Sequence, residues 1–132
     1  MTGPGRNKLQ ERAVKRTDHE PADLAHRIVD LASDKKTNNV VMLRTSEVTS
    51  MADYFIICSG RSEAQVQALS GAIIDTLRDE GVRAMGVEGL KSAGWVLIDY
   101  GSVIVHVFSP EEREYYGLER LWSEAARVVR MI

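Results

Sequence analysis

Two stretches of the chain repeat apolar residues every three or four positions, and this spacing predicts two amphipathic helices. The first begins at Pro21, a residue that fits the first turn of a helix, and ends near Lys35–Lys36. The second begins after Ser62, which forms a capping box with Gln65, and stops at Gly81. The apolar positions are Leu24, Ile28 and Leu31 in the first helix and Val66, Leu69, Ile73 and Leu77 in the second.

Shorter apolar runs between and after these helices predict five strands. Val40–Leu43 is one such run, and the apolar run within Ala52–Ser59 is typical of a strand covered on both faces. A weaker strand is expected over Val82–Val87. Residues 88–108 indicate a hairpin of two strands that turns at Tyr100–Ser102.

The C-terminal pattern predicts a further helical segment. Ser109 is placed to cap it, with Pro110 at its first position, and Gly117 is expected to kink or split it. The helical stripe then continues through Leu118, Leu121, Trp122 and Ala125. We therefore expect the order helix, strand, strand, helix, strand, strand, strand, helix, which is typical of an α/β fold with a single mixed five-stranded sheet and packed helices.

Residues 1–20 differ from the rest in composition. They hold five basic and three acidic residues and few apolar side chains, so little burial would offset the entropy of ordering them. We expect a flexible basic tail over 1–20 and a folded domain over 21–132. The tail is interpreted as an uncommitted extension, with a basic arm that touches RNA as the alternative.

Composition adds limits on function and location. The chain has 132 residues and a formal net charge of −2, which does not favour a strongly basic nucleic-acid-binding domain, and no direct nucleic-acid site is predicted. Cys58 is the only cysteine, so an intramolecular disulfide is excluded. No apolar run approaches the roughly 20 residues of a membrane-spanning helix, and the N-terminus lacks the apolar core of a signal peptide. We expect a cytoplasmic protein.

Several linked motifs, in order along the chain, are similar to those of one known family. They are Ala52–Ser62, Gln65–Ala68, Glu88–Gly89, Gly94–Gly101, Val105–Phe108 and Tyr115–Trp122. Together they resemble the ribosomal silencing factor family, also called RsfS or Iojap, from about Asp23 to Ala125. The basic tail lies outside this resemblance.

The resemblance implies a non-enzymatic factor that binds the large ribosomal subunit through its protein L-fourteen. A bound factor would sterically block subunit joining and repress translation, and a role in large-subunit maturation is an alternative. The family's ribosome-binding surface includes the hairpin, its fold resembles nucleotidyltransferases, and some members form homodimers. No membrane, cofactor or metal is implied.

A nucleotidyltransferase-type enzyme is the alternative from a different functional class. That chemistry needs a Gly-Ser loop followed by two alternating acidic residues on a strand, which hold metal ions. Ser59–Ser62 provides such a loop, but Glu63 and Asp75 fall on the predicted helix and Asp99 stands alone on its strand. We therefore expect the fold without the catalysis, and no catalytic residue is assigned.

Cysteine and histidine residues offer little further chemistry. Cys58 with His106 would be a nucleophile and a base, but a cysteine within an apolar strand is more often an inert core residue. His19, His26 and His106 lack the spacing of zinc ligands, so no metal site is expected. His106 itself fits either a core position or the edge of an interface.

The hairpin supplies the candidate partner-binding residues. By strand alternation Trp95 and Asp99 point away from the face that Val96 and Ile98 share, and an exposed tryptophan beside an acid suits a binding hot spot. Ordinary core packing is the alternative for both aromatic residues of the hairpin. The predicted partner-binding residues are Trp95, Asp99, Tyr100 at the turn, and Lys91 and Glu88 at the rim.

Overall fold

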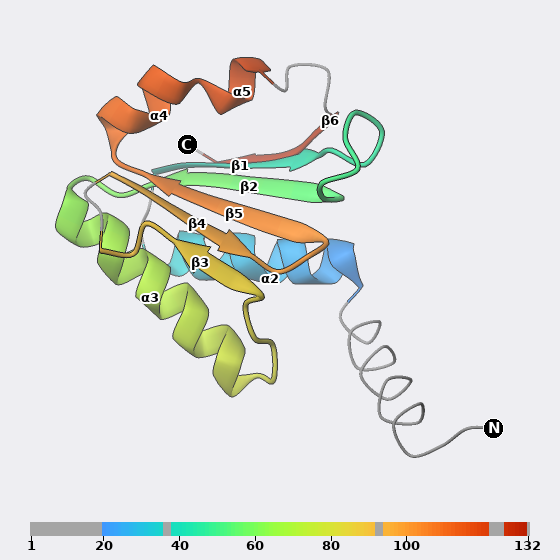
Figure 1. The fold of residues 1–132 in the computed structure, drawn as a ribbon, viewed down its shortest axis with the longest axis horizontal. Helices are drawn as coiled ribbons and strands as arrows, with labels where there is room; N and C mark the ends of the chain where they lie inside the picture. The colour runs from blue at the N-terminus through green and yellow to red at the C-terminus, as the bar shows by residue number, and fades with distance from the viewer. Residues whose placement is uncertain (1–19, 36–37, 92–93, 122–125, 132) are drawn as a thin grey trace.

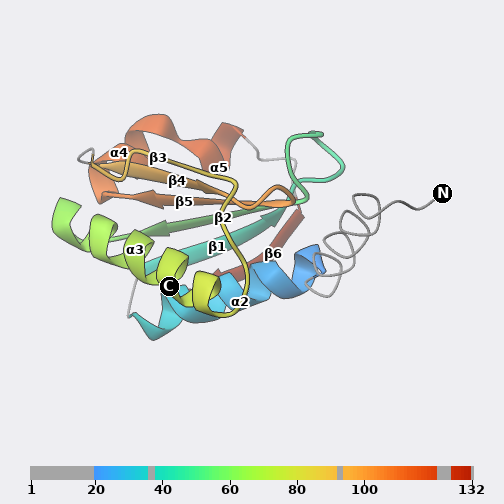
Figure 2. The same ribbon diagram turned by 60° about the horizontal axis from the view of Figure 1, so that its bottom comes forward.

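The computed structural model describes residues 20–35, 38–91, 94–121 and 126–131, which form one mixed sheet with helices against both faces (Figures 1 and 2). The elements are α2 (Pro21–Asp34), β1 (Asn38–Arg44), β2 (Tyr54–Ser59), α3 (Glu63–Asp79), β3 (Gly86–Glu88), β4 (Trp95–Asp99), β5 (Val103–Phe108), α4 (Pro110–Tyr116), α5 (Leu118–Leu121) and β6 (Ala126–Met131). The predicted α/β class and mixed sheet are confirmed. Residues 1–19 of the predicted tail, Trp122 and Ala125 lie outside the described residues.

Within the described residues, the sheet has six strands in the order β3-β4-β5-β2-β1-β6. β2 and β5 run parallel, and the other neighbouring pairs run antiparallel. The prediction of five strands was therefore one short, because β6 pairs with the outer edge of β1. Val128 and Val129, whose β-branched side chains favour strands, lie in a segment for which the sequence offered no strand prediction.

The ends of α3 follow from local sequence, as predicted. The Ser62 hydroxyl accepts a hydrogen bond from the Gln65 backbone N–H at 3.2 Å, and Gln65 in turn accepts from the Arg61 N–H at 2.8 Å. At the other end Gly81 adopts a φ of 91°, and the Val82 N–H donates to the Leu77 carbonyl at 2.7 Å. Because Val82 belongs to this helix end, β3 is shorter than the predicted strand over Val82–Val87.

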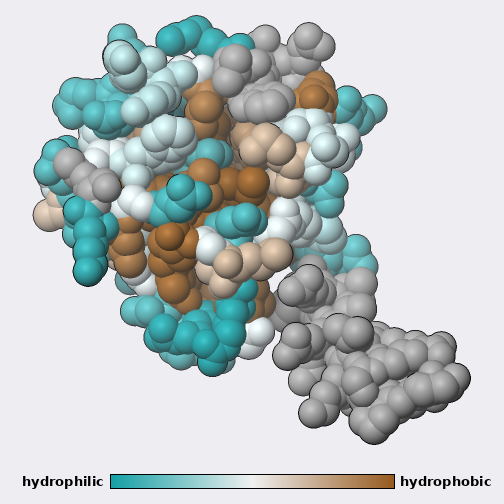
Figure 3. Space-filling view, in the orientation of Figure 1, coloured by the Kyte–Doolittle hydropathy of each residue, from teal (hydrophilic) through white to brown (hydrophobic). Residues whose placement is uncertain are grey.

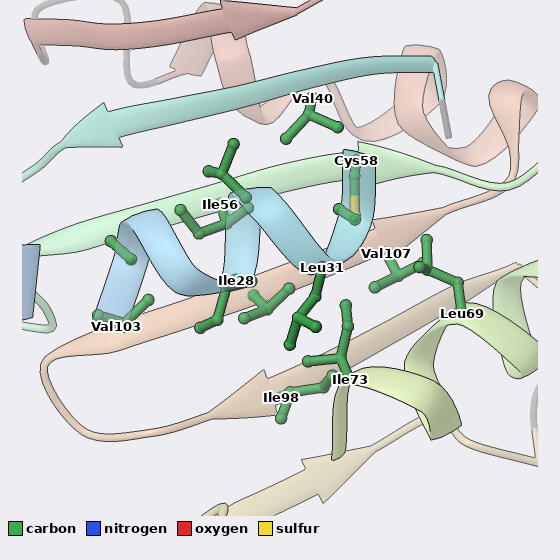
Figure 4. Close-up of a cluster of buried hydrophobic side chains, with 14 of the residues drawn as sticks. Ile28, Leu31, Val40, Ile56, Cys58, Leu69, Ile73, Ile98, Val103 and Val107 are labelled. Carbon is green, nitrogen blue, oxygen red and sulfur yellow. The ribbon is translucent and has the colours of Figure 1, made fainter. Parts of the chain in front are cut away.

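One face of the sheet is covered by α2 and α3 and forms the larger core (Figure 4). Its buried side chains are almost all aliphatic, and they come from both helices and from strands β1, β2, β4 and β5. Ile28 and Leu31 from α2 and Leu69 and Ile73 from α3 point toward the strands. The two amphipathic stripes predicted from sequence are the parts of the helices that this face buries.

The opposite face has a smaller core, which α4 and α5 approach from the side away from α2 and α3 (Figure 2). Its buried residues are Val41, Leu43, Ala52, Phe55, Ile57, Ile104 and Phe108. Gly117 separates α4 from α5 in a left-handed conformation with a φ of 57°, which confirms the predicted split. We call this side of the sheet the open face.

Candidate functional site

Strand β4 divides its side chains between the two faces as the sequence predicted. Val96 and Ile98 are fully buried in the core beneath α2 and α3. Trp95 and Leu97 are half-buried and pack against the core of the open face. A strand turns successive side chains to opposite faces, so these neighbours serve different surfaces.

Strand pairing sets out which residues lie in register on the open face. Glu88 on β3 pairs with Leu97, which pairs with His106 on β5, and His106 pairs with Ile57 on β2. Asp99 pairs with Ile104 in the row beside it. The exposed end of the first row is Glu88, on the edge strand β3. Figure 3 shows hydrophobic residues gathered on the molecular surface over the β3–β4 side of the molecule.

Aromatic rings form a continuous cluster around Trp95 on this face. The Trp95 ring lies 5.1 Å from the Phe108 ring in a stacked arrangement and 4.4 Å from the Tyr116 ring. Tyr116 meets the ring of Tyr115 edge-on at 5.1 Å. The cluster therefore runs from the buried Phe108 to Tyr115, which is 79% exposed.

His106 lies beneath this cluster and holds Trp95 in place. It is buried, and the Trp95 indole N–H donates to its Nδ1 atom at 3.2 Å, so Nδ1 is unprotonated and the neutral ring carries its proton on Nε2. Burial lowers the pKa of His106 to about 4. The sequence allowed His106 either a core position or the edge of an interface, and the structure shows the core position. Its hydrogen-bond partner is Trp95, not a backbone group or a carboxylate.

The other predicted partner-binding residues differ in their exposure. Glu88 and Lys91 are exposed, as expected of a rim. Asp99 is half-buried, and its carboxylate accepts a hydrogen bond from the Gly101 N–H at 2.7 Å, so it shapes the hairpin turn. Gly89 has a φ of 83°, and a side chain there would collide with the Trp95 carbonyl oxygen, so a glycine lets the loop that carries Lys91 pass beside β4.

The prediction that Tyr100 joins this surface is wrong. Tyr100 is 8% exposed and packs into the core beneath α2 and α3, on the same face as Val96 and Ile98. Strict alternation continues through the end of β4, so the turn does not redirect the side chain. Burial raises the pKa of its phenol to about 12.

Tyr116 is a candidate that sequence reasoning left unassigned. It is 44% exposed and touches Trp95 through its ring, although 21 positions separate the two residues in the sequence. The contact arises because α4 folds back over the end of β5. The only sequence signal for this role of Tyr116 was the pair Tyr115–Tyr116 beside the predicted kink at Gly117.

The Ser59–Ser62 loop borders a cleft of about 370 Å³ at the end of β2. Two carboxylates, Glu114 and Glu119, line the cleft, but both lie on the helical segments α4 and α5. Glu119 accepts a hydrogen bond from the Arg113 guanidinium at 2.8 Å. Cys58 is fully buried behind the loop, and burial raises the pKa of its thiol to about 12, which leaves it protonated and unreactive.

Among the described residues, no group of three or more His, Cys, Asp or Glu side chains could hold a metal ion. The same part of the chain contains no helix whose length and apolarity would suit a membrane span. The fold and the open face thus define a small α/β domain with a half-exposed aromatic cluster, the kind of surface that recognises another macromolecule.

Comparison with known proteins identifies this domain. The sequence profile of the family described as "Ribosomal silencing factor during starvation" matches residues 17–131. The chain is 42% identical over 106 residues to a ribosomal silencing factor RsfS of Halalkalibacterium halodurans, covering 80% of this chain and 91% of that protein. This chain belongs to the ribosomal silencing factor family.

Solved and more distant relatives agree with this assignment. A crystal structure of a Chromobacterium violaceum protein superposes with a TM-score of 0.76 at 36% identity, covering 79% of this chain and 87% of that one. A mouse protein named "Mitochondrial assembly of ribosomal large subunit protein 1" is 27% identical over 99 residues, which cover 73% of this chain and 43% of that protein. The likeness therefore extends from bacterial to organellar proteins.

Proposed function

We propose that this protein binds the large ribosomal subunit through protein L-fourteen, blocks subunit joining and so represses translation. Membership of the ribosomal silencing factor family supports the ribosomal role. The observation that carries the proposal is the half-buried Trp95, held between Phe108 and Tyr116 and fixed by His106 on the open face. Large aromatic residues that are held rigidly at a surface bind partners at low entropic cost.

The open face would form the centre of the contact, and the exposed charges of Glu88 and Lys91 its rim. Rim charges mainly change the association rate and its salt dependence, whereas a buried aromatic anchor changes the dissociation rate. Repression then needs only occupancy, because a bound domain fills space that the small subunit would take. No nucleotide or metal enters this mechanism.

The test is co-sedimentation of the purified protein with isolated large subunits, and direct binding to purified L-fourteen. Trp95→Ala should weaken both by about 2 kcal/mol or more, the size of a hot-spot effect. The matched control is Tyr54→Ala, which truncates a half-buried aromatic residue that packs against the core on the helix-covered side. Equal affinities of Trp95→Ala and the native protein would overturn the assignment of the open face.

A second assay separates silencing from subunit maturation. Mature small and large subunits are mixed with the protein, and joined ribosomes are measured on a sucrose gradient. Silencing predicts fewer joined particles in proportion to occupancy. Undiminished joining at saturating protein would favour the maturation role, which would use the same surface. Sedimentation of the free protein would show whether it forms a homodimer, which the family resemblance implies for some members.

A nucleotidyltransferase-like fold is also part of the proposal, without the activity. The loop at Ser59–Ser62 supports it. The enzyme alternative has weaker support, because the carboxylates beside that loop lie on helical segments and Glu119 is already engaged by Arg113. Magnesium-dependent turnover of a nucleoside triphosphate would restore the enzyme alternative.

A further inference from the structure

The cleft beside the Ser59–Ser62 loop lies where the two parallel strands end. β2 ends at Ser59 and β5 at Phe108, and the Gly60 N–H donates to the Phe108 carbonyl at 2.9 Å. In open α/β sheets, ligands bind in the crevice beyond the carboxyl ends of such strands. The 17-residue helix α3 begins directly after the loop, so its partially positive N-terminus faces the same region.

Arg113 lines the cleft and is only 8% exposed. Its Nη1 atom donates to the Asn39 carbonyl at 2.7 Å and to the Ser59 hydroxyl at 2.9 Å, while its Nε atom donates to Glu119. Its Nη2 atom is buried without a hydrogen-bond partner among the described residues. The guanidinium therefore lacks one hydrogen-bond acceptor, and an unpaired buried donor on a charged group lowers the stability of the folded state.

Two more arginines line the cleft, and the backbone beside them is tightly packed. Arg61 and Arg120 are exposed at its rim, so three arginines face the carboxylates of Glu114 and Glu119. A Cβ atom at Gly60 would lie 2.7 Å from the Val66 backbone nitrogen, so glycine keeps the loop against the start of α3. Positive charge therefore exceeds negative charge among the residues that line the cleft.

We infer that this cleft binds a small phosphorylated ligand of about nucleotide size, with a phosphate held by Arg113, Arg61, Arg120 and the start of α3. Arginine forks and helix N-termini are the groups that proteins use for phosphate oxygens. A volume of about 370 Å³ lies within the range of small-ligand sites.

A small ligand fits better than an RNA strand. An RNA backbone is contacted through exposed basic side chains, whereas Arg113 is recessed and the chain as a whole carries a net charge of −2. None of the cleft residues lies in the aromatic cluster, so the cleft and the proposed ribosome contact are separate surfaces.

The test is an NMR titration of the full-length ¹⁵N-labelled protein with ADP and, separately, with inorganic phosphate, at constant ionic strength set by chloride. We expect saturable shifts that centre on the amides of Gly60, Arg61, Arg113 and Gly117. ADP should bind more tightly than phosphate, because it fills more of the cleft. Shifts that do not saturate, or that spread evenly over the surface, would overturn the inference.

Variants of the rim arginines test the site without disturbing the fold, because Arg61 and Arg120 are exposed. Arg61→Ala and Arg120→Ala should each weaken ADP binding at least about fivefold, because each removes a charge-assisted contact. Arg83→Ala, an exposed arginine outside the cleft, is the matched control and should bind as the native protein does. Equal weakening by the control, or shifts with a short RNA oligonucleotide but not with ADP, would contradict a small-ligand site.

Discussion

The two faces of the sheet use the same strands but differ in chemistry and in cover. The face beneath α2 and α3 buries an aliphatic core, to which Ile28, Ile73 and Ile98 contribute. The open face buries fewer residues and gathers the aromatic rings of Phe55, Trp95 and Phe108 with His106. The helix-covered face holds the fold together, whereas the open face keeps large, rigid side chains within reach of a partner.

Two neighbouring residues of β4 test this difference between the faces most directly. Ile98→Ala should lower the free energy of unfolding by about 3 kcal/mol, because it leaves a cavity beneath α3. Leu97→Ala, on the open face, should lower it by only about 1 kcal/mol, because Leu97 is half-buried. Urea denaturation measures both values.

Large-subunit affinity should show the reverse order. Leu97→Ala is expected to weaken binding, and Ile98→Ala to leave it unchanged when measured on the folded fraction. If Ile98→Ala weakened binding more than Leu97→Ala, the assignment of stability to the helix-covered face and of binding to the open face would be wrong.

His106, on the open face, predicts a dependence of stability on pH. Burial lowers its folded-state pKa to about 4, against an ordinary value of 6.5, so between these values the unfolded chain binds a proton that the folded chain does not. Stability should therefore be complete above pH 6.5 and fall as pH drops toward 4, by on the order of 3 kcal/mol in total. Below that range both states are protonated and the loss levels off.

Unfolding measured from pH 7 to pH 4 tests this, with His106→Gln and the exposed His26→Gln compared with the native protein. Only His106→Gln should flatten the acid slope. Protonation of Nδ1 would also break the hydrogen bond from Trp95, so indole fluorescence in a Trp122→Phe background should change over the same range. An unaltered slope in His106→Gln would assign the acid sensitivity to other groups.

The smallest expected effect on stability concerns the exposed end of the aromatic cluster. Tyr116→Leu keeps an apolar side chain but loses the ring contact with Trp95, so unfolding should change by less than about 1 kcal/mol. Large-subunit affinity should nevertheless fall, because the anchor beside Trp95 is lost. Tyr115→Leu is the control, since Tyr115 does not touch Trp95 through any ring contact that the structure describes. A large-subunit affinity of Tyr116→Leu equal to that of the native protein would exclude Tyr116 from the contact.

Local sequence was sufficient for much of the fold because local interactions decide those features. The caps at Ser62 and Gly81, the split at Gly117 and the division of β4 between two faces depend on neighbouring residues and on strand geometry. Continued alternation places Tyr100 on the face of Val96 and Ile98, as the structure shows. The error was to expect that the turn would override it.

Features that depend on contacts between distant segments could not be predicted in this way. β6 exists because it pairs with the outer edge of β1, about 90 positions earlier in the chain. Arg113 lies within the charged run Glu111–Glu114, which suggests a solvated helix, yet the ends of β1 and β2 bury it. The contact of Tyr116 with Trp95 likewise requires α4 to be folded onto β5.

The seven residues of α4 carry both Arg113, which faces the cleft, and Tyr116, which faces Trp95. One short helix therefore belongs to two surfaces, and a shift of that helix alters both. Thermodynamic linkage makes such a relation reciprocal: if a ligand of Arg113 changes the affinity for the ribosome by some factor, the ribosome changes the affinity for that ligand by the same factor. A domain of this size would then sense a small molecule and act on translation without a second domain to pass the signal.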